Sequence, residues 1–161
     1  MNNSAKRLIN YFYVPFSLII LLFSLMPTTR ANEYSDSYST DIKKFWEVWK
    51  QEKKIFTSCQ TPEKSKRFLV NTLEISGNTE VSEANHEVIE KVILKNPTCL
   101  LDTVITLPIE SQMKLTNLFF VRPLYHNIND IESSLNKAWN KKKYRHIKSE
   151  FIRLKKNIYT K

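Results

Sequence analysis

Apolar residues recur at intervals of three and four positions along most of this chain, which is the spacing of one face of an α-helix. The first clear run covers about residues 40–57 and places five apolar side chains near one face: Ile42, Phe45, Trp46, Trp49 and Phe56. The sequence has no convincing run of four or more residues with the alternation of a half-buried strand. A single glycine, Gly77, also argues against a fold rich in β-hairpins. The pattern therefore predicts an all-α protein.

Helix start and stop signals divide this pattern into six or seven short helices. Thr40 and Asp41 can cap the first helix. Proline follows a capping residue at Thr61–Pro62 and Asn96–Pro97, and Pro108 begins a further segment. Proline suits the first position of a helix, where no N–H group is needed. We expect Gly77 to end a helix in the left-handed conformation. The expected helices cover about residues 40–57, 61–76, 79–95, 96–107, 108–122 and 127–139, followed by a basic C-terminal helix within 140–161.

Connectors of about two to six residues favour antiparallel packing of consecutive helices. The last six helices would then form three stacked hairpins, as in a fragment of an α-solenoid. The sequence shows no repeat at a fixed period. A compact orthogonal bundle is therefore the alternative architecture.

The first 31 residues have the organisation of an export signal. Lys6 and Arg7 precede an uncharged stretch, and Thr29, Arg30 and Ala31 form a small-x-small end. We expect cleavage after Ala31, a polar tether over residues 32–39, and one helical domain over residues 40–161. The alternative is an uncleaved anchor, because the uncharged stretch approaches the length of a membrane-spanning helix.

Both interpretations of the N-terminus place the domain outside the membrane. It is periplasmic or secreted after cleavage, or anchored in the inner membrane and facing outside. The chain contains two cysteines, Cys59 and Cys99. In an exported protein such a pair favours a disulfide bond. The alternative is two buried thiols that act as small apolar side chains.

Positive charge is concentrated at the C-terminus. The whole chain has a net charge of +9, and residues 137–161 alone hold ten lysines and arginines with one acid, which is also +9. Such a segment is expected to contact an acidic protein, anionic lipid or wall polymer. The alternative is a solvated helix face that has no partner. Export argues against a nucleic-acid partner, and a membrane partner is expected only if the signal is retained. The candidate contacts are Lys141, Lys142, Lys143 and Arg145.

A second candidate interface is the segment RPLYHNIND, residues 122–130. Arginine and aromatic residues on a loop are frequent anchors of protein interfaces. Arg122, Tyr125 and His126 are therefore candidate partner contacts. The alternative is an ordinary connector between two helices.

The sequence contains no complete catalytic motif. HEVIE, residues 86–90, matches the first part of the zinc-protease pattern H-E-x-x-H, but Glu90 stands in place of the second histidine. His86, Glu90 and Glu83 are weak metal-ligand candidates, and a solvated acidic face is the alternative. We expect neither a metal nor another cofactor.

These features favour a non-enzymatic, exported protein-binding domain. A specific version is an immunity or inhibitor protein that occupies a toxin or hydrolase, with charge complementarity speeding capture. The alternative is an envelope accessory or structural protein, tethered to the membrane, that contacts anionic lipid or wall polymer. A metal hydrolase is less favoured.

Overall fold

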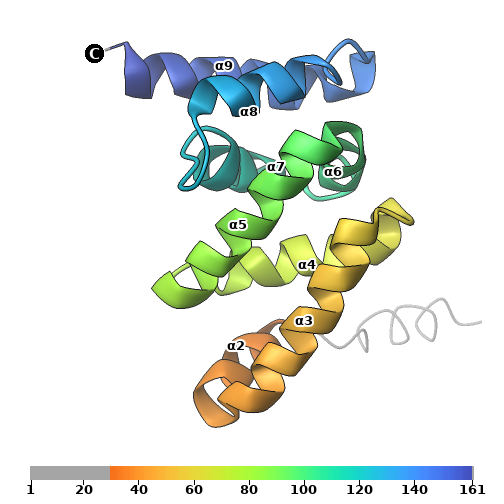
Figure 1. Ribbon diagram of the computed structural model, residues 1–161, viewed down its shortest axis with the longest axis vertical. Coiled ribbons are helices and arrows are strands. Elements are labelled where there is room, and N and C mark those ends of the chain that lie inside the picture. Colours follow the sequence, from red (N-terminus) through yellow and green to blue (C-terminus); the bar gives the residue numbers. More distant parts are fainter. Residues whose placement is uncertain (1–29, 161) are drawn as a thin grey trace, which may run out of the picture. The chain divides into compact units, whose positions relative to one another are not determined.

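The computed structural model describes residues 30–160, and every regular element in that range is helical (Figure 1). This confirms the all-α prediction. A π-helical segment, η1 (Thr116–Phe120), continues one helix, and a 3-10 turn, η2 (Lys142–Tyr144), leads into the last. The eight α-helices of this range are α2 (Arg30–Thr40), α3 (Ile42–Ser58), α4 (Pro62–Glu74), α5 (Thr79–Lys95), α6 (Pro97–Val104), α7 (Ile109–Leu115), α8 (Ile128–Asn136) and α9 (Arg145–Tyr159).

Residues 32–39, for which the sequence predicts a polar tether, form most of helix α2. The segment is polar, but Tyr34 and Tyr38 are one helical turn apart and both rings pack on Phe45, at centroid distances of 4.9 and 5.1 Å. The Tyr38 hydroxyl also donates to Glu80 Oε2 at 2.7 Å. Two aromatic contacts thus hold a segment that lacks a continuous apolar stripe. The expected signal sequence falls on residues 1–29, which lie outside the described residues, and on the first turn of α2.

The helix starts follow the predicted caps. The side chains of Asp41, Thr61 and Asn96 accept hydrogen bonds from the backbone amides three residues later, at 3.0, 3.2 and 3.2 Å. The prediction for Gly77 is wrong, because no described glycine has a positive φ. The left-handed residue is Cys59, with φ 53°, at the C-terminal end of α3.

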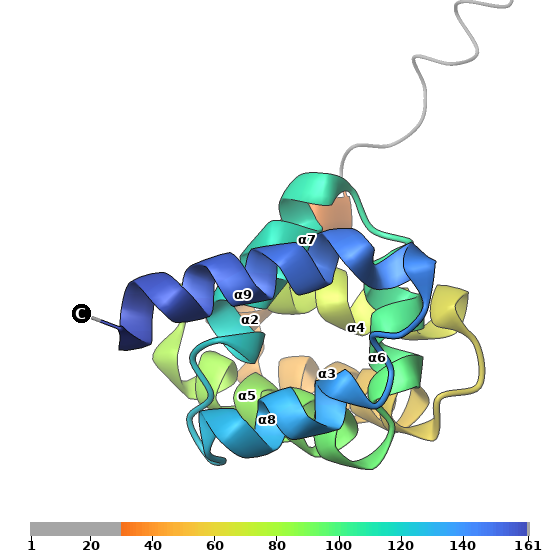
Figure 2. The same cartoon turned by 90° about the horizontal axis from the view of Figure 1, so that it is seen from above.

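Helices pack both on their neighbours in sequence and on helices farther along the chain. Helix α4 packs against α3 and α6, α5 packs against α8 and α6, and α9 packs across η1 and α7 (Figures 1 and 2). Of the three predicted hairpins, the pairs α6–α7 and α8–α9 are not among the main packing pairs of the described residues, whereas α4 does contact α5. The connection between α5 and α6 is as short as it can be, because Asn96 is both the C-cap of α5 and the N-cap of α6. A single residue between two helices makes a corner and leaves no loop in which the chain can reverse.

The predicted aromatic stripe of α3 is part of the core. Phe45 and Phe56 are fully buried, Trp49 is nearly so, and Phe56 stacks on Phe68 of α4 with ring centroids 4.7 Å apart. Ile42 departs from the pattern, because 51% of its surface is exposed. Ile42, the first residue of α3, therefore lies outside the packed face.

The buried residues from α3 to α9 form one continuous core.

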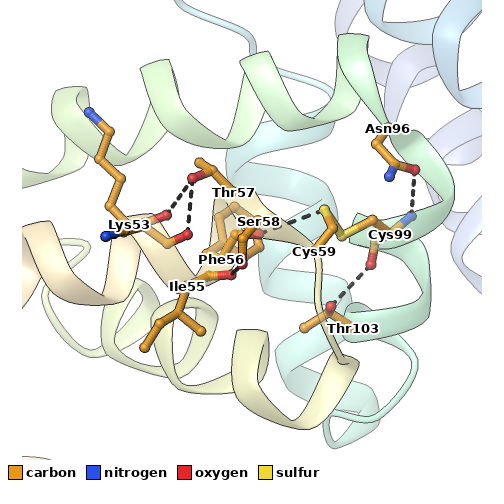
Figure 3. The surroundings of a disulfide bond; sticks show 10 residues. Lys53, Ile55, Phe56, Thr57, Ser58, Cys59, Asn96, Cys99 and Thr103 are labelled. Atoms are coloured by element: carbon orange, nitrogen blue, oxygen red, sulfur yellow. Dashed lines mark hydrogen bonds between the residues drawn. A yellow bond between two sulfur atoms is a disulfide. The ribbon is translucent and has the colours of Figure 1, made fainter.

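The predicted disulfide joins Cys59 to Cys99, whose Cα atoms lie 5.8 Å apart (Figure 3). It connects the C-terminal end of α3 to the first turn of α6. Asn96 accepts a hydrogen bond from the Cys99 amide, which fixes the backbone that presents this cysteine. The bond therefore closes a loop that contains the whole of α4 and α5.

Candidate interaction site

Glu90 is the most unusual polar residue of the described chain, because it is a carboxylate with no solvent exposure. One oxygen accepts from the Leu124 amide at 2.7 Å and lies 3.3 Å from His86 Nδ1. The other accepts from the Tyr125 amide at 3.0 Å and lies 2.9 Å from His126 Nδ1. Glu90 therefore fastens the loop after η1 to helix α5.

The hydrogen bonds decide the charge of this carboxyl group. Burial acts to raise the pKa of Glu90, because a charge is less stable away from water. Hydrogen bonds from His86, from the Leu124 and Tyr125 amides and from His126 outweigh burial and hold the pKa of Glu90 below its usual range. The group is therefore ionised at neutral pH. Because an ionised carboxylate can only accept, each histidine presents Nδ1–H to it.

The loop held by Glu90 turns apolar side chains toward solvent. Leu124 is 58% exposed and Tyr125 is 51% exposed, and the neighbouring Arg122 is also exposed. The backbone behind them is fixed by the buried carboxylate, so little conformational entropy remains to be lost when a partner covers them. This combination is typical of a preformed interface anchor.

The C-terminal end of α9 lies beside this loop in both views (Figures 1 and 2). The Tyr159 hydroxyl donates to the Val121 carbonyl at 2.9 Å, while its ring remains half exposed. We call Arg122, Leu124, Tyr125 and Tyr159 the loop surface. It combines two tyrosines, an arginine and a leucine on a fixed backbone.

The weak metal-ligand candidates His86, Glu90 and Glu83 do not converge on one site. Glu83 is exposed on α5, and the described residues contain no group of three or more His, Cys, Asp or Glu side chains arranged to hold a metal ion. The His86 ring packs on Phe119, with centroids 4.4 Å apart. Both Glu90 oxygens already receive N–H donors. The His86–Glu90 pair is therefore part of the loop attachment.

The basic candidates of the C-terminal segment divide into two kinds. Lys143 pairs with Asp102, and the Tyr144 hydroxyl donates to the same carboxylate, so Lys143 ties η2 to α6. Burial acts to raise the pKa of Asp102, but these two donors outweigh it and lower that pKa. Lys141, Lys142 and Arg145 are exposed and have no carboxylate partner within residues 30–160.

The two groups of predicted contacts do not form one site. Lys141, Lys142 and Arg145 lie at the start of α9, whereas the loop surface lies at its end. The 15 residues of α9 separate them by about 22 Å at 1.5 Å per residue. His126 is partly buried against Glu90, so it belongs to the attachment of the loop more than to its exposed surface.

Reasoning from the sequence missed Leu124, Tyr159 and the role of Glu90. A usable signal was present for Glu90. His86, Ile89, Glu90 and Ile93 follow the i, i+3, i+4, i+7 spacing, so the acid occupies a core position of α5. A carboxylate at such a position needs donors from elsewhere in the chain.

A comparison with known protein families, with curated proteins and with solved structures finds no significant match for this chain. Among residues 30–160, no helix has the length and apolar content needed to cross a bilayer.

Proposed function

We propose that this chain is an exported, non-enzymatic helical domain that binds another protein through the loop surface. The observation that carries the proposal is the full burial of Glu90 beneath a loop whose Leu124 and Tyr125 side chains face solvent. Burying a charge beneath a surface loop has a considerable free-energy cost. Such a cost is expected where the loop must keep one shape. Because about half of each side chain is already buried, covering Leu124 and Tyr125 against a partner contributes about 1 kcal/mol each.

The export part of the proposal is supported by the disulfide and by the N-terminal pattern. Disulfide bonds persist in oxidising compartments such as the periplasm and the extracellular space. The bond between Cys59 and Cys99 suits such a location. We propose a periplasmic or secreted domain, with an anchored domain facing outside as the alternative.

The test compares two substitutions of similarly exposed apolar residues. Tagged wild-type protein, Leu124→Asp and the control Ile42→Asp are each incubated with the exported proteins of the source cell. Ile42 is 51% exposed and lies at the start of α3, away from the loop in sequence. We expect one protein to bind in a fixed ratio to the wild type and to Ile42→Asp, and to be lost with Leu124→Asp.

Equal retention by Leu124→Asp, or no retained protein at all, contradicts the proposal. Calorimetry with the purified partner then measures the loss of affinity directly. Complete burial of Leu124 against the partner predicts at least a tenfold loss.

The specific version of the proposal is an immunity or inhibitor protein. It predicts that the captured partner is a toxin or hydrolase whose activity falls when the wild-type domain is added at equimolar concentration. Leu124→Asp leaves that activity unchanged, and Ile42→Asp inhibits as the wild type does. A captured partner whose activity the domain leaves intact overturns the inhibitor version while the binding function stands.

The alternative function is that of an envelope accessory protein that contacts anionic lipid or wall polymer. It is favoured by a different observation, the exposed cations of η2 and α9. No observation favours a metal hydrolase, because the oxygens of Glu90 are committed to the loop.

A further inference from the structure

The outer face of α9 carries a line of exposed residues that is independent of the loop surface. Arg145, Ser149, Ile152 and Lys156 follow one another at intervals of four, three and four residues, so they lie along one face of the helix. All four are exposed, and Ile152 leaves 51% of its surface in solvent. Lys141, just before η2, and Lys142, its first residue, are also exposed and precede the helix.

This line contains cations and no acid. The one acid of residues 137–160 is Glu150, which pairs with Arg153 at 2.6 Å. Two further lysines turn to other helices, Lys143 to Asp102 of α6 and Lys155 to Glu132 of α8. Asp102, Glu150 and Glu132 therefore form ion pairs with other cations of this segment. Lys141, Lys142, Arg145 and Lys156 have no ion pair within the described part of the chain.

The line is also uncovered. Helix α9 packs on its neighbours through Ile147 and Phe151, which are buried on its opposite side. Figure 2 shows α9 uncovered along its length, and no other described element lies over its outer side. Arg145 and Lys156 are 11 residues apart, so the cations extend over about 17 Å.

We infer that the outer face of α9, defined by Lys141, Lys142, Arg145, Ile152 and Lys156, binds the anionic headgroups of a lipid bilayer. Lysines and arginines spread along an exposed helix are attracted to a flat anionic surface, and each contributes separately. An exposed apolar side chain among them enters the boundary between headgroups and acyl chains, as on interfacial amphipathic helices.

The shape of the face favours a bilayer over an acidic protein. A stable protein interface covers about 800 Å² on each partner with good complementarity. A single convex helix offers only a strip, whereas a bilayer needs no complementary shape. The predicted export signal also brings the domain to a membrane surface. This inference does not rest on the proposed protein partner, because the loop surface takes no part in it.

The test uses the exported protein, with whichever N-terminus it then carries, and vesicles of 30% phosphatidylglycerol in phosphatidylcholine. Neutral phosphatidylcholine vesicles give the background. The variant reverses four charges: Lys141→Glu, Lys142→Glu, Arg145→Glu and Lys156→Glu. The matched control reverses four exposed lysines of α3 with the same change in net charge: Lys43→Glu, Lys44→Glu, Lys50→Glu and Lys54→Glu.

We expect the wild type to prefer anionic vesicles, and the α9 variant to lose on the order of 100-fold in that binding. The α3 control keeps most of the binding, because its charges lie elsewhere. A fluorophore on Ile152→Cys shifts to the blue with anionic vesicles, and one on Ile42→Cys does not. This second readout holds even if an N-terminal anchor attaches the protein to the vesicles.

Several outcomes overturn the inference. They are equal losses in the two charge-reversed variants, no preference for anionic vesicles, no shift at position 152, and tighter binding to polyglutamate or an oligonucleotide than to the vesicles. Circular dichroism checks that both variants stay helical. Leu124→Asp tests the other proposal separately, because it should lose the protein partner and keep the vesicle binding.

Discussion

Glu90 and Glu52 are both buried carboxylates on long helices, but their surroundings shift the pKa of the carboxyl group in opposite directions. Glu90 receives two backbone amides and two histidines, and its pKa is lowered. Glu52 of α3 receives Asn71 Nδ2 at 2.7 Å and lies 2.6 Å from Arg67 Nε. Burial raises the pKa of Glu52, and these two partners offset it only in part.

The difference lies in the kind of donor. Backbone amides of a folded loop cannot turn away, and they hold their dipoles toward the carboxylate without further loss of entropy. The Arg67 side chain is 71% exposed, so water competes for its charge. Glu90 is thus a fixed acceptor around which a loop is built. Glu52 is a buried acid whose partners are the Asn71 amide and one solvent-exposed cation.

The largest effect should come from the disulfide, which acts on the helix that carries Glu52. Replacing both cysteines, Cys59→Ser and Cys99→Ser, opens a loop of 40 residues. The loop-entropy relation predicts a loss of about 4 kcal/mol in the free energy of unfolding. Urea denaturation of the variant and the oxidised wild type measures it. Equal stabilities of the two proteins would contradict the predicted contribution of the bond.

Replacing each glutamate by its neutral isostere tests the comparison itself. Glu90→Gln turns one acceptor into a donor that faces existing N–H groups, and we expect a loss of about 3 kcal/mol. Glu52→Gln should change stability by about 1 kcal/mol or less, since burial already disfavours the charge there. Chemical denaturation at neutral pH measures both. Similar losses in the two variants would mean that the donors around Glu90 have no special role.

The pH dependence of stability should differ in sign between the two sites. Because the folded pKa of Glu90 is lowered, its contribution is present above the unfolded pKa of about 4.3 and is lost as pH falls toward the folded pKa. Because the folded pKa of Glu52 is raised, its contribution is present below the unfolded pKa and is lost as pH rises through the folded pKa.

Denaturation between pH 3 and pH 7 separates these contributions. Glu90→Gln should reduce the loss of stability in acid, and Glu52→Gln should increase it. We expect these two changes in the pH dependence of stability to be smaller than the loss of stability in Glu90→Gln at neutral pH. Each change depends only on the difference between the folded and unfolded pKa of one carboxyl group. Parallel pH profiles for both variants would contradict the opposite directions assigned to the two groups.

Features that depend on neighbouring residues could be predicted from the sequence. The helical class, the N-terminal caps at Asp41, Thr61 and Asn96 and the exposed positions of Arg122 and Tyr125 all follow from local spacing and turn chemistry. The disulfide followed from the even pair of cysteines and the expected export.

Features that depend on distant contacts could not be predicted in this way. The pairing of helices is set by packing between segments far apart in sequence, as for α5 and α8. Three of the four donors to Glu90 come from residues 34 to 36 positions later. Helix α2 is held by Tyr34 and Tyr38 against Phe45, a contact that hydropathy alone does not reveal.

Hydrogen exchange at the Leu124 and Tyr125 amides tests most directly whether Glu90 fixes the loop. Both amides donate to the buried carboxylate, so they should exchange slowly in the wild type. In Glu90→Gln we expect them to exchange roughly 100-fold faster, while the amide of Phe151 in α9 stays more strongly protected. Rapid exchange in the wild type, or equal rates in the two proteins, would contradict the account.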